Sequence, residues 1–248
     1  MKLRIPINTL WNARFDLLQS LSGLALALFM WGHMAFVSSI LLGHDAFWIV
    51  SKFFEGYFFL GYGVPQIVSL VVLAVWMLLM LHAILALRKF PASWRQYRTL
   101  WQHSRGLRHE DTWLWWVQVV TGFALFFLSS VHLYDMFIEP ELIDPYGSAD
   151  LVWSGRRWPM LFLLLLCVEV HGTVGLYRLA LKWGWPRFGS EARTRKILKR
   201  LMWFLIVFLI ALGLVTLSTF MRIGYDHAPH RGELYTPSFI QHQGESLP

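Results

Sequence analysis

The sequence predicts an all-α, polytopic membrane protein with five transmembrane helices. Hydrophobic residues make up 56% of the 248 residues and charged residues only 15%, and the mean hydropathy is +0.47. Nearly all charges lie outside five continuous apolar stretches, each near the ~20 residues that a helix needs to cross a bilayer. This pattern excludes a soluble globule, a disordered chain, a collagen-like fibre and a transmembrane barrel.

The boundaries of the five helices follow from these stretches and from the residues that flank them. Pro65 precedes the second stretch and Pro159 opens the fourth, where a missing N–H costs little, while Asp111 with Thr112 can cap the third. The first stretch is too long for a signal-peptide core and is expected to be retained. We expect the helices at residues 15–42, 66–88, 112–136, 158–182 and 198–221.

The distribution of Lys and Arg predicts the orientation in the membrane. Seventeen of the 22 lie before the first helix or in the connections that follow the second and fourth, and five lie on the other side. Because Lys and Arg resist translocation, we expect the N-terminus in the cytoplasm and the C-terminus outside. The basic clusters at 88–108 and 178–200 then face the cytosol, where lipid or a docked protein is a better partner than nucleic acid.

Residues 1–222 are expected to form one domain, followed by an external C-terminal tail, residues 223–248, that lacks the periodicity of a further helix. Its three histidines are interpreted as solvated side chains rather than metal ligands: His227, His230 and His242. The single cysteine, Cys167, lies in the fourth stretch, so the chain alone cannot build a disulfide, a thiolate metal cluster or a C-x-x-C-H haem attachment. We find no internal repeat and no Gly-rich phosphate loop.

One histidine lies in each of the first four predicted helices: His33, His82, His132 and His171. A single intramembrane histidine is usually a packing or hydrogen-bonding residue. Whether these four instead bind a metal depends on the depths at which they lie in the membrane. At 1.5 Å per residue, His33 and His132 lie about 28 and 31 Å from the cytosolic edge, and the other two about 9–10 Å from it. The four therefore form an outer and an inner pair, each drawn from two helices.

Two histidine pairs at two depths suit two haems with two axial imidazoles each, whereas zinc would require four ligands at one depth. Two imidazoles fill the axial positions of the iron, so such haems carry electrons rather than bind substrate. Gly23 and Gly122 each lie ten residues before an outer histidine, at the level of the inner pair. We expect their bare backbone to admit the inner porphyrin, the alternative being ordinary small-residue helix packing.

The segments around the four histidines carry a family resemblance. They read FMWGHMAFVSSILLG at His33, LHAILALRKFP at His82, LWWVQVVTGFALFF with VHLY at His132, and VEVHGTVGLYRLALKWGW at His171. Over roughly residues 15–215, the chain resembles the dihaem cytochrome b subunit of quinol:fumarate reductases. The resemblance implies two haems b, the outer one held by His33 and His132 and the inner one by His82 and His171.

The resemblance also implies contacts to the haem propionates. For the inner haem they are Gln19, Ser20, Trp115 and Lys182, all near the cytosolic interface, where polar donors can meet carboxylates. For the outer haem the family carries a basic residue before the fourth helix, where this chain has Leu151. Arg156 and Arg157 are the candidates to replace it.

Two carboxylates are candidates for proton transfer. Glu55 lies in an apolar outer loop, SKFFEGYFF, and the resemblance implies that it is the general base at the quinol site. Glu169 lies inside the fourth helix, about 200° around it from His171, so the two side chains cannot face the same haem. The resemblance assigns to Glu169 a proton that crosses the membrane with each electron and cancels the charge movement.

The implied function is that of a membrane anchor in the bacterial inner membrane, which binds a cytosolic flavoprotein and iron–sulfur protein and oxidises menaquinol. An anchor for succinate:menaquinone reductase would have the same architecture, and whether the complex dimerises stays open. An anchor for a periplasmic hydrogenase or formate dehydrogenase is disfavoured by the basic cytosolic connections. A haem-free transporter or channel would need broken helices or a polar pore, and the spans have few polar interior residues.

Overall fold

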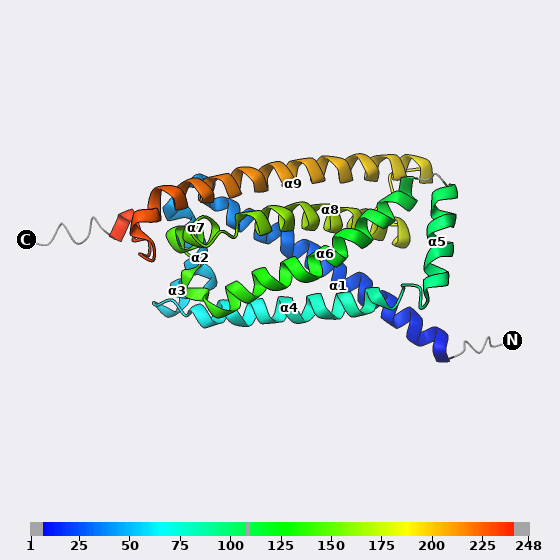
Figure 1. Cartoon of the computed structure of the whole chain (residues 1–248), viewed down its shortest axis with the longest axis horizontal. Coiled ribbons are helices and arrows are strands. Elements are labelled where there is room, and N and C mark those ends of the chain that lie inside the picture. The colour runs from blue at the N-terminus through cyan, green and yellow to red at the C-terminus, as the bar shows by residue number, and fades with distance from the viewer. Residues whose placement is uncertain (1–6, 108–109, 241–248) are drawn as a thin grey trace, which may run out of the picture. The chain divides into compact units, whose positions relative to one another are not determined.

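Five long helices dominate the computed structural model, which describes residues 7–107 and 110–240 (Figure 1). Each of the five is long and apolar enough to cross a membrane, and no strand occurs among the described residues. The predicted fold class, all-α with five membrane-spanning helices, is confirmed. The helices are α1 (Ile7–Val37), α4 (Pro65–Leu87), α6 (Glu110–Ile138), α8 (Trp158–Trp183) and α9 (Glu191–His227).

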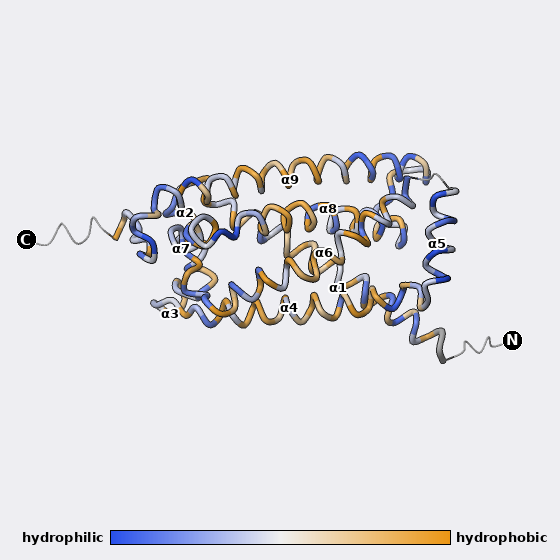
Figure 2. Tube along the Cα trace, in the orientation of Figure 1, coloured by the Kyte–Doolittle hydropathy of each residue, from blue (hydrophilic) through white to orange (hydrophobic). Residues whose placement is uncertain are grey.

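The helix α4 has an exposed apolar surface of the kind that faces lipid. Leu70, Met77 and Ile84 each expose 66–67% of their surface. They are seven residues apart, close to two helical turns, so they form one apolar stripe along the helix. In Figure 2 the long helices are mostly orange along their middle parts, whereas α5 (Trp94–Leu107) is largely blue.

Short helices occupy the connections between the long helices and the ends of two of them. Besides α5, they are η1 (Ser38–Leu42), α2 (His44–Phe54), α3 (Tyr57–Leu60), η2 (Pro140–Leu142), α7 (Pro145–Val152) and η3 (Ala228–His230). The bounds of α4 and α8 agree with the prediction to within one residue, whereas α1 stops at Val37 and η1 covers the rest of the predicted first helix. Two long helices run well beyond a predicted bound, because hydropathy detects only their apolar part. α1 begins eight residues earlier, and α9 begins seven residues earlier and ends six residues later.

The predicted cap of the third long helix is wrong. The helix α6 begins at Glu110, so Asp111 lies within its first turn. The Asp111 carboxylate instead accepts a hydrogen bond from the Tyr177 hydroxyl at 3.0 Å and pairs with Arg195. It ties α6 to α8 and α9 rather than closing its own helix.

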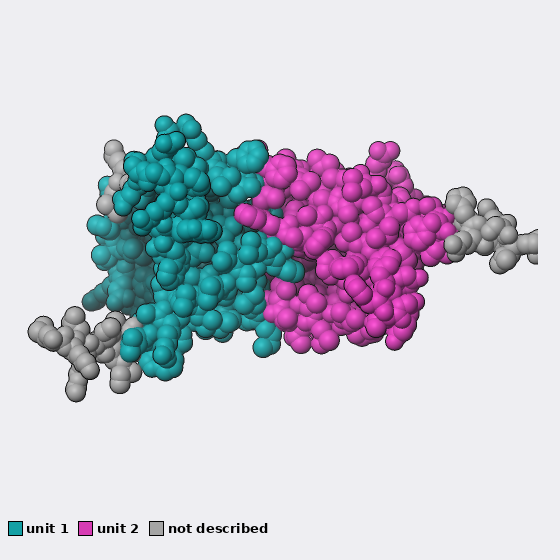
Figure 3. All heavy atoms as spheres, turned by 180° about the vertical axis from the view of Figure 1, so that it is seen from behind, with its two compact units in different colours: residues 1–29, 77–126, 167–206 teal, residues 30–76, 127–166, 207–248 magenta. Residues whose placement is uncertain are grey.

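The chain divides into two compact units (Figure 3): unit 1 contains residues 1–29, 77–126 and 167–206, and unit 2 contains residues 30–76, 127–166 and 207–248. All five long helices contribute a segment to each unit. The division separates the two predicted histidine pairs. His82 and His171 belong to unit 1, and His33 and His132 belong to unit 2.

The core of unit 2 explains why α9 runs past its predicted end. Phe220 of α9 packs with Ile40, Phe47, Ala149 and Val152, and Ile223 joins this cluster from the edge. At Gly224 an added Cβ would collide with the carbonyl oxygen of Ala149. Burial against α7 therefore continues the helix beyond the apolar span that the sequence marks.

His227, predicted to be solvated, is buried, with 8% of its surface exposed. Its Nδ1 lies 3.1 Å from the Asp150 carboxylate, and its ring stacks on Tyr146 with centroids 4.1 Å apart. His230 is exposed, as predicted, and His242 lies outside the described residues. The prediction for His227 was wrong because its partners are distant in sequence.

The segment after α9 is bound to unit 2 through carboxylates. Asp45 accepts hydrogen bonds from the Ser238 backbone and side chain and, at 2.8 Å, from the Tyr235 hydroxyl. These bonds, those from Ser238 first, lower the pKa of Asp45, whereas burial raises the pKa of Tyr235 to about 12. Asp144 accepts from the backbone N–H of Gly147 and Tyr235, yet burial raises its pKa.

Candidate functional site

The outer pair, His33 of α1 and His132 of α6, comes together in unit 2. The two ring centroids lie 6.1 Å apart, with an interplanar angle of 54°. An imidazole nitrogen binds a metal ion at about 2.0 Å, so two rings that share one ion from opposite sides have centroids about 6 Å apart. The separation of these rings fits a shared metal.

In unit 1, the ring of His82 (α4) packs against α1. Its Nδ1 lies 3.1 Å from the hydroxyl of Ser22, and it also forms a hydrogen bond with the backbone of Gln19. At Gly23 an added Cβ would lie only 2.8 Å from Cε1 of this ring. The glycine therefore leaves the space that the imidazole occupies.

The ring of His171 (α8) meets α6 in the same way. Its Nδ1 lies 2.9 Å from the carbonyl oxygen of Gln118 and 3.3 Å from the hydroxyl of Thr121. At Gly122 an added Cβ would again lie 2.8 Å from Cε1 of the ring. His82 and His171 are also close enough to interact electrostatically.

Both glycines thus lie at the level of the inner pair, as their spacing predicted. We predicted that the bare backbone of these glycines admits the inner porphyrin, with ordinary small-residue helix packing as the alternative. In the structure both glycines contact the imidazole rings of His82 and His171. Ser22 and Thr121 were missed, although each directly precedes a glycine that the sequence had marked.

Glu55 is buried, with 1% of its surface exposed, but it is not alone in its pocket. Lys52, in the last turn of α2, donates to both carboxylate oxygens, at 2.6 and 2.8 Å. The backbone of Gly63 lies so close that an added Cβ would collide with Glu55 Oε2. The sequence predicted an apolar setting for this carboxylate and missed its lysine partner, whose i,i+3 spacing was the available signal.

Glu169 is also buried, with 2% exposed, and its setting differs from that of Glu55. Its Oε1 has no hydrogen-bond partner among the described residues. Thr173, one turn further along α8, likewise has a buried hydroxyl without a partner in that part of the chain. The two residues are four positions apart, so both polar atoms lie on one face of α8.

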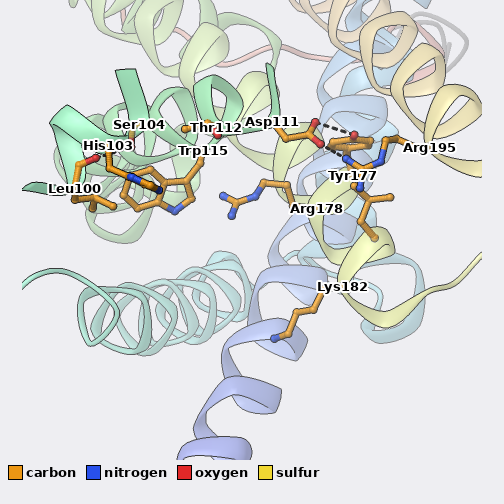
Figure 4. Close-up of a pocket in the computed structure, with 11 residues that line it drawn as sticks. Leu100, His103, Ser104, Asp111, Thr112, Trp115, Tyr177, Arg178, Lys182 and Arg195 are labelled. Carbon is orange, nitrogen blue, oxygen red and sulfur yellow. Dashed lines mark hydrogen bonds and ion pairs between the residues drawn. The ribbon is translucent and has the colours of Figure 1, made fainter. Parts of the chain in front are cut away.

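The four residues expected at the inner propionates all belong to unit 1, though not to one cluster. Trp115 and Lys182 line a cavity of about 560 Å³ together with Arg178 and His103 (Figure 4). Lys182 also donates to the hydroxyl of Ser20 at 3.0 Å. Gln19 is not among the residues that line the cavity, and its buried Oε1 has no partner among the described residues.

On the outer side, the two arginines considered as substitutes at Leu151 have different settings. Arg157 donates to Asp135 at 2.8 Å, and the Asp135 side chain is only 10% exposed. Arg156 has a positive φ of 54°, in the left-handed region that few residues other than glycine adopt. Asp135 lies three residues after His132 on α6, so Arg157 is the arginine that is fixed next to the outer pair.

The described residues contain no group of three or more His, Cys, Asp or Glu side chains that could hold a metal ion. The donor sets present are two imidazoles in each unit. Such sets fit the axial positions of a haem iron, whose equatorial ligands come from the porphyrin.

The chain is similar to membrane subunits of one family. The family model described as "Succinate dehydrogenase/Fumarate reductase transmembrane subunit" matches residues 94–221. The chain is 48% identical over 215 residues to the fumarate reductase cytochrome b subunit of Helicobacter pylori strain J99, covering 87% of this chain and 83% of that protein. It is 47% identical over 215 residues to the protein of the same name from Wolinella succinogenes, covering 86% and 84%.

Proposed function

This chain belongs to the family of succinate dehydrogenase and fumarate reductase transmembrane subunits, and we propose that it is the dihaem anchor of a fumarate reductase. In this role it oxidises menaquinol near the outer side and delivers electrons to a cytosolic iron–sulfur subunit. The observation that carries the proposal is the pairing of four intramembrane histidines, one pair in each unit. The names of the relatives favour fumarate reduction over succinate oxidation as the direction.

Each histidine pair would hold one haem b: His33 and His132 the outer one, His82 and His171 the inner one. When bound, the haems supply one-electron transfer between the quinol and the partner subunit. The ring separation of 6.1 Å supports the outer assignment. The Nδ1 contacts of His82 and His171 support the inner one, because they leave Nε2 of both rings available as the ligand.

Glu55 is the proposed general base of quinol oxidation, which releases two protons. Burial shields this carboxylate from water, and Lys52 holds both of its oxygens in one orientation. A base must lie within hydrogen-bond reach of the proton that it takes, so fixing the oxygens favours catalysis. Lys52 is then a positioning residue for Glu55.

Glu169 is the proposed carrier of the compensating proton. Moving one electron against the membrane potential costs about 2.3 kcal/mol per 100 mV, and a proton that moves with it cancels that cost. The buried Oε1 of Glu169, which has no partner among the described residues, supports this role, because it leaves a site at which a proton can bind.

The partners follow from the same assignment. We infer a bacterial inner-membrane location, with the N-terminus in the cytoplasm and the C-terminus outside. The basic α5 and the connection between α8 and α9 would meet anionic lipid, the iron–sulfur subunit and the flavoprotein on the cytosolic side.

An optical redox titration of the purified complex tests the proposal. We expect two b-type haems per chain that reduce at two separate potentials, and His82→Ala and His132→Ala should each remove a different one. In the intact complex, Glu55→Gln should abolish menaquinol oxidation with both haems retained. A spectrum with one haem, or with none, would overturn the assignment.

A further inference from the structure

The two inner imidazoles are held by the same five-residue pattern in two different helices. Residues 19–23 read Gln-Ser-Leu-Ser-Gly in α1, and residues 118–122 read Gln-Val-Val-Thr-Gly in α6. In both, the hydroxyl of the fourth residue lies near Nδ1, the backbone of the glutamine bonds to the ring, and the glycine faces Cε1. We refer to residues 19–23 and 118–122 as the clamp segments.

The carbonyl group of Gln118 defines the tautomer of the His171 ring. The Gln118 carbonyl oxygen, 2.9 Å from Nδ1 of His171, can only accept a hydrogen bond, so Nδ1 carries the proton. The His82 ring also bonds to the backbone of Gln19, and its Nδ1 lies next to the Ser22 hydroxyl. A neutral imidazole protonated at Nδ1 has its lone pair at Nε2, which is the form that binds a metal.

The hydroxyl groups add a second acceptor to each ring. The Ser22 hydroxyl donates its own hydrogen to the Gln19 carbonyl at 3.1 Å, and the Thr121 hydroxyl donates to the Val117 carbonyl at 2.7 Å. With their hydrogens committed to their own helices, both oxygens can only accept from Nδ1–H. Serine and threonine are interchangeable here because the contact uses the hydroxyl alone.

We propose that Ser22 and Thr121 are positioning residues that fix the orientation of His82 and His171 and increase their strength as axial ligands of the inner haem. A ring N–H that donates to an acceptor makes the opposite nitrogen a more basic ligand. A more basic ligand stabilises the oxidised iron and lowers the midpoint potential. This inference rests on the proposed function and adds to it a control of the potential of one haem.

The test is a redox titration of the intact complex that carries Ser22→Ala, Thr121→Val or both. The inner haem is identified as the component that His82→Ala removes. We expect its midpoint potential to rise in each single variant and to rise further in the double variant, with the potential of the outer haem unchanged. The low-temperature electron paramagnetic resonance signal of the oxidised inner haem should change as well, since it reports the orientation of the axial rings.

Two kinds of control keep the result specific. Ser22→Thr and Thr121→Ser retain the hydroxyl and should preserve the wild-type potential and signal. Ser218→Ala and Thr219→Val remove hydroxyls of α9 that bond to carbonyls four residues earlier on the exposed surface of unit 2. These two variants also remove a hydroxyl from a helix, but not one that bonds to His82 or His171. They should therefore leave the midpoint potential and the resonance signal of the inner haem unchanged.

The outcomes separate this inference from the proposed function. An inner haem whose potential and signal stay the same in the double variant would overturn the inference and leave the dihaem assignment intact. Equal shifts in the Ser218→Ala and Thr219→Val controls would also overturn it. A wild-type complex without two bis-histidine haems would instead overturn the proposed function.

Discussion

The two units each contain one histidine pair but surround it differently. In unit 1 the rings of His82 and His171 bond to hydroxyl and carbonyl groups of the spanning helices α1 and α6. In unit 2 two ionisable pairs lie at the ends of helices: Lys52 in the last turn of α2 with Glu55 directly after it, and Asp150 of α7 with His227 at the end of α9. The polar contacts of the inner rings thus come from within the spans, whereas these ionisable pairs of unit 2 lie at or beyond the ends of its spans.

The contrast matches the two proposed tasks. A site that only transfers electrons is served by neutral partners that hold its ligands in one geometry. A site that also releases protons from quinol needs ionisable groups near the water phase. Changes in residues 19–23 and 118–122 should therefore affect the inner haem, and changes at Lys52 and Glu55 should affect quinol oxidation.

The largest effect is expected from Gly122→Leu. Even the first added carbon would lie 2.8 Å from the His171 ring, so the ring must leave its position and the inner haem should be lost. Haem analysis should show about one haem per chain, with the outer haem retained. Gly32→Leu in α1 is the control, because a Cβ there meets its nearest atom at 3.8 Å. Loss of both haems, or of neither, in Gly122→Leu would contradict the separation of the two sites.

Lys52→Gln should affect the outer site alone. It removes two charge-assisted hydrogen bonds to Glu55, and such bonds contribute about 1.5–3 kcal/mol, so menaquinol oxidation should fall about tenfold to a hundredfold. Both haems should stay bound, with unchanged spectra. Lys52→Arg keeps the charge and should restore much of the rate. Full activity in Lys52→Gln would show that Glu55 needs no fixed partner.

Glu169→Gln tests the one proposed proton group that belongs to unit 1. In this variant each electron that crosses the membrane without a proton should meet an added cost of about 2.3 kcal/mol per 100 mV. In sealed vesicles its turnover should therefore fall by a factor of about 50 for each 100 mV of membrane potential. Addition of an uncoupler should remove the difference from the wild type. If the variant and the wild type responded equally to the potential, Glu169 would carry no compensating proton.

The smallest effect is expected at the end of the chain. Hydrogen bonds from Ser238 and Tyr235 lower the pKa of Asp45 in the folded protein. This stabilisation is complete above the ordinary pKa of an aspartate and is lost as the pH falls through the lowered value. The protection of residues 232–240 against hydrogen exchange, relative to the intrinsic rate at each pH, should therefore fall in acid in the wild type. In Asp45→Asn this protection should already be a few-fold lower at neutral pH.

The exposed Asp226 provides the control for that measurement. Asp226→Asn should leave the exchange of residues 232–240 unchanged at every pH. Protection that persisted in Asp45→Asn at neutral pH would mean that other contacts hold the segment.

The sequence predicts a structural feature of this protein well when the residues that form it are close together along the chain. The five spans and the two histidine pairs follow from hydropathy and helical rise, which are local properties. The clamp hydroxyls gave no signal, because a serine or threonine inside a helix ordinarily bonds to its own backbone, as Ser22 and Thr121 also do. The partners of Asp45 are about 190 residues away, and no local pattern announces a contact of that range.

The clamp segments also bear on how the protein is assembled. The segment in α1 holds the ring of α4, and the segment in α6 holds the ring of α8, so each histidine is tethered to the span that precedes it in the membrane. Each successive hairpin of spans can therefore orient its own imidazole as it leaves the insertion machinery. The proposed inner haem would then bind where the two hairpins meet.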